Sequence, residues 1–446
     1  MSLAIDIGTR FVRFAHLDAA GRPGLADLEG ALPGEGLPVA PGRAGQLVLA
    51  EGCAAFLARH GPPDAVVLLC PPAQSAACSQ VIVECFGTDP GAFPPPRLLR
   101  PAVAVLALLR HDGGAQQGTW AVCELGAAAV EITVCSLAPH RLTVLRTVRR
   151  RPHGGYGAAF DDAVTDAVTD AATHAVTDAV TDAGPGGADA ASLAALGQAL
   201  GAPGAGERLD LSLARAELDP ARHDDTPVLW LRGREVPAGI LRRALLPLRE
   251  ELRQALAEAT IDALPTVVVG GAARLAALRR QAGGTGGCVE LPGGVDPALA
   301  AVLGASLVAA GRVDAADRYP HALVIGTRRV RHGRLTSAEL TLCPPGALVP
   351  AAPAVFACEG GRPVAVGGAG DVPREVEVWA READGGRTVR AGSARLPAST
   401  PDERFHVGVA LALDGTARLV LRPADGGASH EYPLGELPGD FEEVRQ

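Results

Sequence analysis

The chain has 446 residues, of which 48% are hydrophobic and 20% charged, a balance typical of a folded protein that excludes wholesale disorder. Its net charge of −9 argues against binding to nucleic acid through overall charge. All 41 cationic residues are arginines, so chemistry that requires a lysine nucleophile, a Schiff base or a phosphate-reaching ammonium group is excluded.

The cysteines and the apolar runs indicate a cellular compartment. The nine cysteines are scattered and form no Cys-x-x-Cys pair, which argues against a zinc ribbon or a redox motif and indicates reduced thiols. The longest apolar run, at 101–109, is much shorter than the ~20 residues that a membrane span needs. We therefore expect a cytoplasmic protein whose partners include neither a membrane nor a nucleic acid.

Short apolar runs bounded by glycine and proline predict the elements of the first 150 residues. Residues 19–62 are rich in glycine and proline and predict a reduced lobe with one short helix. The expected elements, in chain order, are strands at 3–7 and 11–15, a helix at 46–59, a strand at 65–69, helices at 73–85 and 97–110, and a meander of strands at 120–125, 130–137 and 141–148.

A repeat of Ala-Val-Thr-Asp fills residues 163–182. A period of four residues advances each copy by ~40° around a helix, so neither face becomes cleanly apolar. We interpret the segment at 161–183 as a low-complexity helix. Beyond it the sequence predicts helices at 190–200, 237–259, 273–280 and 297–310, and strands at 227–232 and 266–269.

From about residue 319 the apolar pattern changes to alternation, which is typical of half-buried strands. The expected strands lie at 322–325, 338–342, 375–381, 388–395, 404–413 and 417–422. We therefore divide the chain into an α/β domain at 1–312, a linker at 313–320 and an all-β domain at 321–446.

Two similar turns follow apolar strands and carry an acidic residue. Asp6 precedes Gly8 and Thr9, and such a hairpin can direct backbone N–H groups and a hydroxyl at phosphate oxygens while the carboxylate holds Mg²⁺ or water. Glu124 and Gly126 repeat this pattern within 123–131. Each turn taken alone is equally compatible with an ordinary β-hairpin.

A third turn follows the apolar strand at 266–269. Gly270 and Gly271 end this strand and a helix is expected after them, a place where a planar base or a ribose can press against bare backbone. An ordinary strand-to-helix turn is the alternative.

In their order and spacing, these segments resemble the heat-shock protein 70 (DnaK-like) chaperone family, a branch of the actin and sugar-kinase ATPase superfamily. The matching segments are AIDIGTRFVRFA and AVCELGAAAVEITV for the two phosphate loops, RLLRPAVAVLALLRHDG for the connecting helix, YGAAFD at 156–161, VVVGGAARLAAL for the adenosine motif, and VDPALAAVLGASLVA after it. VEVWAREADGGRTVRAGSARL and FHVGVALALDGTARLVLRP resemble strands of the family's peptide-binding β-sandwich. On these segments the chain is identified as a divergent member of the family.

The resemblance implies an actin-like, two-lobed ATPase domain with a duplicated mixed-sheet α/β core, followed by a small β-sandwich without a helical lid. It implies ATP and Mg²⁺ as cofactors, ADP as the product, and unfolded or extended polypeptides as clients. By the same resemblance Asp6 and Glu124 would bind the metal and serve catalysis. The implied nucleotide-binding positions are Gly8, Thr9, Arg10, Gly126, Ala127, Ala128, Gly157, Gly270, Gly271 and Arg274.

Several positions depart from the family pattern. The family's lysine is missing, Glu124 stands in place of an aspartate, and alanines at 127–129 replace two glycines and a threonine. Losing a positioned cation or hydroxyl commonly lowers an enzymatic rate ~10²–10³-fold. Three hypotheses follow: an ATP-binding chaperone with slow hydrolysis, a degenerate nucleotide-binding pseudo-ATPase that acts as a protein-interaction module, and a sugar or acetate kinase, which the all-β domain disfavours.

Overall fold

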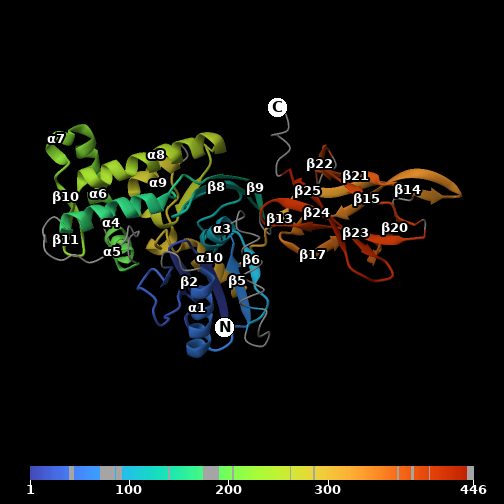
Figure 1. Cartoon of the computed structure of the whole chain (residues 1–446), viewed down its shortest axis with the longest axis horizontal. Helices are drawn as coiled ribbons and strands as arrows, with labels where there is room; N and C mark the ends of the chain where they lie inside the picture. Colours follow the sequence, from blue (N-terminus) through green and yellow to red (C-terminus); the bar gives the residue numbers. More distant parts are fainter. Residues whose placement is uncertain are drawn as a thin grey trace. The chain divides into compact units, whose positions relative to one another are not determined.

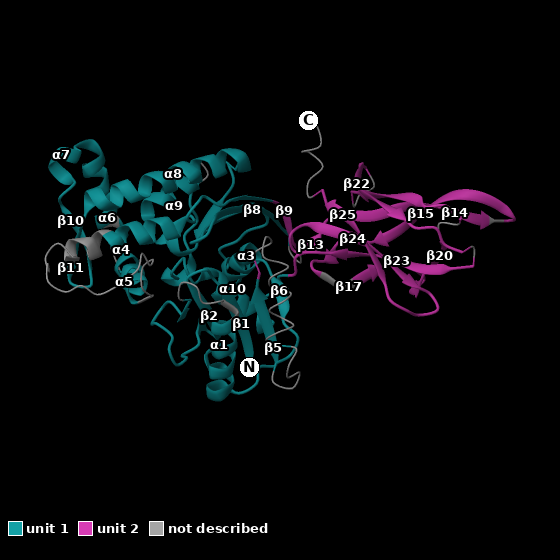
Figure 2. Ribbon diagram, in the orientation of Figure 1, with its two compact units in different colours: residues 1–69, 79–138, 147–315 teal, residues 70–78, 139–146, 316–446 magenta. Residues whose placement is uncertain are grey.

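The computed structural model describes residues 1–39, 45–70, 86, 93–138, 141–173, 190–202, 205–261, 263–284, 287–368, 371–382, 386–400 and 402–438. The chain divides into two units, which Figure 2 shows in different colours. Unit 1 comprises residues 1–69, 79–138 and 147–315, and unit 2 comprises residues 70–78, 139–146 and 316–446. The helix expected at 73–85 lies outside the described residues.

The first sheet of unit 1 is built around a buried hairpin (Figure 1). Its strands are β1 (Ser2–Ile7), β2 (Phe11–Leu17), β3 (Pro23–Leu25), β4 (Leu37–Pro38), β5 (Ala65–Leu69) and β6 (Arg97–Leu99). The order is β3-β2-β1-β5-β6, with β4 also paired to β2. β1 pairs antiparallel with β2 and parallel with β5, and β5 pairs parallel with β6. The strands predicted at 3–7, 11–15 and 65–69 are confirmed.

Two helices accompany this sheet. α1 (Gly45–His60) confirms the helix expected at 46–59, and α3 spans Pro101–His111. The helix predicted at 97–110 is wrong in its first residues, because 97–99 form strand β6. Arg100 is extended (φ −70°, ψ 141°), as steric crowding by a following proline requires, and Pro101 then opens the helix at a position that needs no amide donor.

The second sheet repeats the arrangement of the first. Its strands are β7 (Gly118–Leu125), β8 (Val130–Ala138), β9 (Arg141–Arg150) and β12 (Thr266–Val269), in the order β12-β7-β8-β9. β7 pairs antiparallel with β8 and parallel with β12, as β1 does with β2 and β5. The predicted meander and the strand at 266–269 are therefore confirmed, and each sheet has a central strand with one hairpin partner and one parallel partner.

A helical region lies between β9 and β12 in the chain. It contains α4 (Gly157–Thr173), α5 (Ala190–Gly201), α6 (Ala205–Leu218), α7 (Pro220–His223), the hairpin β10 (Pro227–Leu231) and β11 (Arg234–Pro237), and α8 (Ala238–Ala259). The helices expected at 190–200 and 237–259 and the strand at 227–232 are confirmed. The repeat helix is seen up to Thr173, and residues 174–189 lie outside the described residues. In α8, buried leucines recur every three or four residues, at 241, 245, 248 and 252.

The last part of unit 1 differs slightly from expectation. The helix predicted at 273–280 is split into a 3₁₀ turn, η3 (Gly271–Arg274), and α9 (Ala276–Gly283), because Leu275 between them is extended. A short 3₁₀ turn, η4 (Pro292–Gly294), precedes α10 (Ala300–Ala309), the core of the helix expected at 297–310. A Cβ on Gly304 would overlap the carbonyl oxygen of Ala104 in α3, so the backbones of α3 and α10 touch. α10 also packs on β1, β2, β3 and β5 of the first sheet.

Unit 2 consists of strands in the described residues after Ala316 (Figure 1). They are β13 (Arg318–Tyr319), β14 (Ala322–Arg331), β15 (Arg334–Cys343), β16 (Ala347–Leu348), β17 (Ala351–Phe356), β18 (Cys358–Glu359), β19 (Arg362–Pro363), β20 (Ala365–Gly367), β21 (Arg374–Arg381), β22 (Thr388–Leu396), β23 (Arg404–Leu411), β24 (Thr416–Pro423) and β25 (His430–Glu436). One sheet has the order β15-β14-β21-β22, and the other has β17-β23-β24-β25 with β20 also on β23. All six strands predicted here are confirmed.

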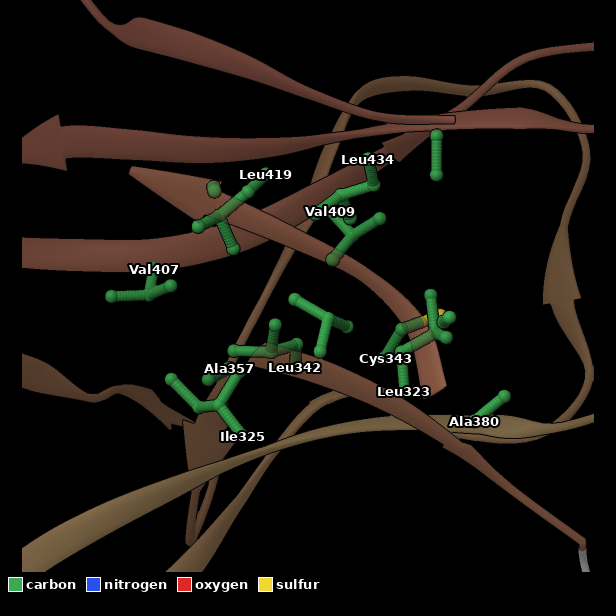
Figure 3. Close-up of a cluster of buried hydrophobic side chains, with 14 of the residues drawn as sticks. Leu323, Ile325, Leu342, Cys343, Ala357, Ala380, Val407, Val409, Leu419 and Leu434 are labelled. Atoms are coloured by element: carbon green, nitrogen blue, oxygen red, sulfur yellow. The ribbon is translucent and has the colours of Figure 1, made fainter. Parts of the chain in front are cut away.

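The two larger sheets of unit 2 share an apolar core, which Figure 3 shows in close-up. Leu323, Leu342 and Val378 come from one sheet, Val409 and Leu419 from the other, and none of the five is exposed to solvent. Alternation along each strand places these side chains on the inner face and charged side chains on the outer face.

The fold class is mixed α/β, with helices concentrated in unit 1 and strands in unit 2. No helix in the described part of the chain is both long and apolar enough to span a membrane.

Candidate functional site

The turn between β1 and β2 places the first predicted group of residues. The Gly8 amide donates to the carbonyl of Phe11 at 3.0 Å, and a Cβ on Gly8 would lie 2.7 Å from that oxygen, so the turn requires glycine. Asp6 lies opposite Arg13 in the hairpin and accepts a hydrogen bond from its Nη1 at 3.3 Å. Burial raises the pKa of Asp6, and the Arg13 charge opposes this rise. Thr9 is exposed at the tip.

The turn between β7 and β8 places the second group. Gly126 donates to the carbonyl of Ala129 at 3.0 Å, which closes the turn. Glu124 and Glu131 lie directly opposite each other in the hairpin, and Arg149 Nη1 lies 3.4 Å from Glu131 Oε2. Burial, together with the charges of Glu131 and Asp6, raises the pKa of Glu124 to about 8, and the Arg149 charge opposes this rise. The structure therefore brings Asp6 and Glu124 within electrostatic reach of each other.

The start of α4 is bonded to the β7–β8 turn. Gly157 donates its amide to the carbonyl of Gly126 at 3.0 Å, and Ala158 donates to the carbonyl of Ala127 at 3.0 Å. A Cβ on Gly155 (φ +84°) would lie 2.7 Å from the Ala127 oxygen, so glycine permits the close approach. These two amides, which a phosphate-binding helix would present to a ligand, are therefore already bonded within the protein.

The third glycine turn lies beside the second. Gly270 (φ +96°) donates to the carbonyl of Pro297 at 2.8 Å, and a Cβ there would lie 2.5 Å from the oxygen of Leu125 at the end of β7. By contrast, a Cβ on Gly271 would meet open space. The bare backbone at Gly271 is thus accessible, as a base or ribose contact needs.

Arg274, the predicted partner of the base, is held by two carboxylates. Its Nη1 lies 2.6 Å from Glu35 Oε1, and its Nη2 lies 2.7 Å from Asp296 Oδ2. Its Nε also donates to Asp296 at 3.0 and 3.1 Å. Arg274 is only 8% exposed and Glu35 only 2%. The guanidinium is therefore committed to protein partners.

These contacts extend into one buried chain of ion pairs. It runs through Asp6, Arg13, Glu35, Arg274 and Asp296, with Arg13 Nη2 at 3.5 Å from Glu35 Oε2. Sequence reasoning missed Arg13, Glu35 and Asp296 as parts of the site. Asp296 lay in a matched segment and could have been found, whereas Glu35 lies in a glycine-rich loop with no local signal.

The guanidinium group of Arg10 is also paired within the protein. Its Nη2 donates to Asp162 Oδ1 at 2.6 Å and lies 3.5 Å from the carbonyl of Ala158, both in α4. The neighbouring Asp161 is buried, which raises its pKa to about 7, although the Arg10 charge lowers it. Arg10 therefore links the β1–β2 turn to α4 and does not point a free cation at a ligand.

The residues of the three turns meet some of the requirements for binding Mg²⁺ and a nucleotide. Burial raises the pKa of Asp6, Glu124 and Glu131 and so destabilises their charged forms, which a bound divalent cation would stabilise. No group of three or more His, Cys, Asp or Glu side chains among the described residues could hold a metal. A metal at Asp6 and Glu124 would therefore take its other ligands from water or phosphate.

The chain matches no protein-family model, and no curated protein matches its sequence. Any function assigned to the site therefore rests on its geometry and chemistry.

Proposed function

We propose that unit 1 is an actin-like nucleotide-binding domain, and that the protein is a chaperone of the heat-shock protein 70 type, in which unit 2 binds extended polypeptide. One observation carries the proposal. The two sheets of unit 1 repeat one topology, and each central strand, β1 and β7, ends in a carboxylate followed by a glycine turn. The Asp6 and Glu124 carboxylates lie close enough for one charge to raise the pKa of the other.

In this proposal each element has a distinct role. Asp6 and Glu124 hold Mg²⁺, which when bound neutralises phosphate charge. Gly8 and Gly126 shape the two turns, the backbone N–H groups that follow them at 9–10 and 127–128 face the phosphates, and the exposed backbone of Gly271 lies against the base or ribose. With the metal bound, the Glu124 carboxylate would also orient the attacking water.

The missing lysine and the alanines at 127–129 remove a cation and a hydroxyl that the family places at the transferring phosphate, so hydrolysis is expected to be slow. The alternative, a pseudo-ATPase that binds nucleotide and acts as an interaction module, is favoured by a separate observation. Arg10 and Arg274 are paired with Asp162, Glu35 and Asp296.

The experiment measures Mg·ATP binding by calorimetry and then phosphate release with enzyme in excess. Gly271→Trp is expected to abolish binding without unfolding the protein, because the added side chain points into open space. Gly24→Trp is the matched control, because Gly24 in β3 also has open space and lies outside the three turns. Binding with turnover supports the chaperone, and binding without turnover supports the pseudo-ATPase. Absence of binding, or equal binding by the Gly271 variant, refutes the nucleotide site.

A further inference from the structure

The hairpin of β14 and β15 concentrates positive charge in a chain that is negative overall. Residues 328–334 read RRVRHGR, and the stretch 326–338 contains four arginines and no acidic residue, although the whole chain has a net charge of −9. The turn is formed by His332 (φ 50°) and Gly333 (φ 75°), between Arg331 and Arg334. Two positive φ values are typical of the tight turn that matches the twist of a hairpin.

The charges of this hairpin are largely unneutralised. Arg328 and Arg334 are exposed and make no ion pair with any residue that the structure describes, whereas Arg329 is paired with Glu359. Arg331 and Arg334 lie directly opposite each other in the register. The exposed guanidinium groups of Arg328 and Arg334 are therefore available to an anionic partner.

The same hairpin exposes an apolar pair. Val330 is 70% exposed and Leu335 is 61% exposed, and the two are direct cross-strand neighbours. Because opposing residues of a hairpin share a face, they form one small apolar surface, and Arg328 shares that face two residues away. β15 is also an edge strand of its sheet, and its residues 334–337 are exposed. The edge can therefore pair with an added strand.

A groove of about 1610 Å³ begins at the base of the hairpin. Arg328 and Arg329 line one part of it, and Val366, Val376 and Leu396 contribute partly exposed apolar side chains from both sheets. Carboxylates line it too. Glu375 and Glu377 are neutralised by Arg390 at 3.4 and 3.5 Å, and Asp402, Glu403 and Asp425 come from loops at the ends of other strands. Arg374 and Arg404 also line the groove, and neither makes an ion pair with a described residue, so they add to the positive charge of Arg328.

We propose that the β14–β15 hairpin selects acidic extended polypeptide segments that carry aliphatic side chains. The inference rests on the proposed polypeptide-binding function of unit 2 and names the charge of its clients. Carboxylates of the segment pair with Arg328 and Arg334, and its apolar side chains contact Val330 and Leu335 or enter the groove. Its backbone can pair with the free edge of β15.

Other polyanions fit this surface less well. The hairpin at 322–343 contains no Phe, Tyr or Trp on which a nucleic-acid base could stack, although Trp379, Phe405 and Tyr432 line the groove at its base, and the net charge of −9 disfavours a polyanion as long as a nucleic acid. Membrane binding scales with buried apolar area, and two aliphatic side chains at the tip offer little. A short acidic peptide matches the unpaired arginines, the apolar pair and the strand edge together.

The test compares fluorescent peptides that share one aliphatic pattern and carry Glu, Gln or Arg at the polar positions. Anisotropy titrations with the full chain are expected to show the Glu peptide binding at least about tenfold more tightly than the Arg peptide, with a preference that weakens as salt rises. Arg328→Glu with Arg334→Glu should remove or reverse the preference. This variant should still fold, because Arg328 and Arg334 are exposed and make no ion pair with a described residue that the change would break.

Arg387→Glu is the matched control, because Arg387 is an exposed arginine on a different turn of the same unit. It should leave all three affinities within about twofold. Equal binding of the three peptides would overturn the charge assignment and leave polypeptide binding intact, whereas no binding of any peptide would contradict both. Tighter binding of an oligonucleotide or of phosphatidylserine vesicles than of the Glu peptide, sensitive to the same double variant, would also overturn the proposal.

Discussion

Glu35 is the residue whose replacement tests the buried ion-pair chain most directly. It is 2% exposed and lies between two arginines, with Oε1 at 2.6 Å from Arg274 and Oε2 at 3.5 Å from Arg13. Glu35→Gln removes the charge and keeps the shape of the side chain. The two guanidinium groups then face each other across a neutral amide in a buried site, and each repels the other.

The expected loss of unfolding free energy follows from these contacts. Removing one partner of a buried ion pair typically costs about 3–5 kcal/mol, because the remaining charge stays buried without compensation. Each arginine here keeps one other carboxylate, Arg274 with Asp296 and Arg13 with Asp6. The loss should therefore fall at the lower end, about 3 kcal/mol. A double-mutant cycle with Arg274→Gln should return a coupling energy of about 1–3 kcal/mol.

The assay must report on unit 1 alone. The chain has three tryptophans, of which Trp120 and Trp230 lie in unit 1 and Trp379 lies in unit 2. Urea unfolding followed by tryptophan fluorescence in a Trp379→Phe background therefore follows unit 1. Glu29→Gln, at an exposed glutamate, is the control and should change the free energy by less than about 0.5 kcal/mol. If Glu35→Gln behaves like this control, the ion-pair chain does not stabilise the fold and the reasoning fails.

Three further predictions follow from other features. The pKa of Glu124 is raised in the folded state from 4.5 to about 8, so the folded state binds the proton more tightly than the unfolded state does. The free energy of unfolding should therefore fall as the pH rises between these two values. Urea titrations at several pH values should show this fall, and Glu124→Gln should flatten it. Gly304→Ala, which would normally favour a helix, should instead destabilise by about 2 kcal/mol or more because its Cβ overlaps Ala104, while thermal unfolding of Gly206→Ala should show little change. Cys358 is the exposed member of the seven described cysteines, so Cys358→Ser should remove one equivalent from the fast phase of thiol titration, and an unchanged fast phase would contradict its exposure.

Sequence reasoning located elements whose signal is local. The strand at 65–69 was predicted with its observed bounds because an unbroken apolar run between turn residues has few other interpretations. α6 was not predicted, because Leu209, Leu211 and Leu213 alternate like a strand. In the helix Leu209 and Leu213 are buried and Leu211 is 55% exposed.

Within the candidate site, too, residues with a local sequence signal could be predicted and residues without one could not. The glycines of the site could be predicted, because Gly8 and Gly270 occupy turns that a Cβ would obstruct. Such turns require glycine, so the local sequence indicates them. The partners of Arg274 could not. Glu35 lies in a loop far away in the sequence, and only the folded chain brings its carboxylate to the guanidinium. Whether Arg274 is free for a ligand is thus a property of tertiary structure.

The packing of α10 has a consequence for how the protein is made. This helix covers β1, β2, β3 and β5, yet it is the last helix of unit 1. On the ribosome, the first sheet therefore emerges long before the helix that completes its core. At a synthesis rate of about 5–20 residues per second, roughly 10–50 s pass between the synthesis of the sheet and the synthesis of α10, and one face of the sheet stays exposed during that time. The nascent chain itself would need protection during that interval.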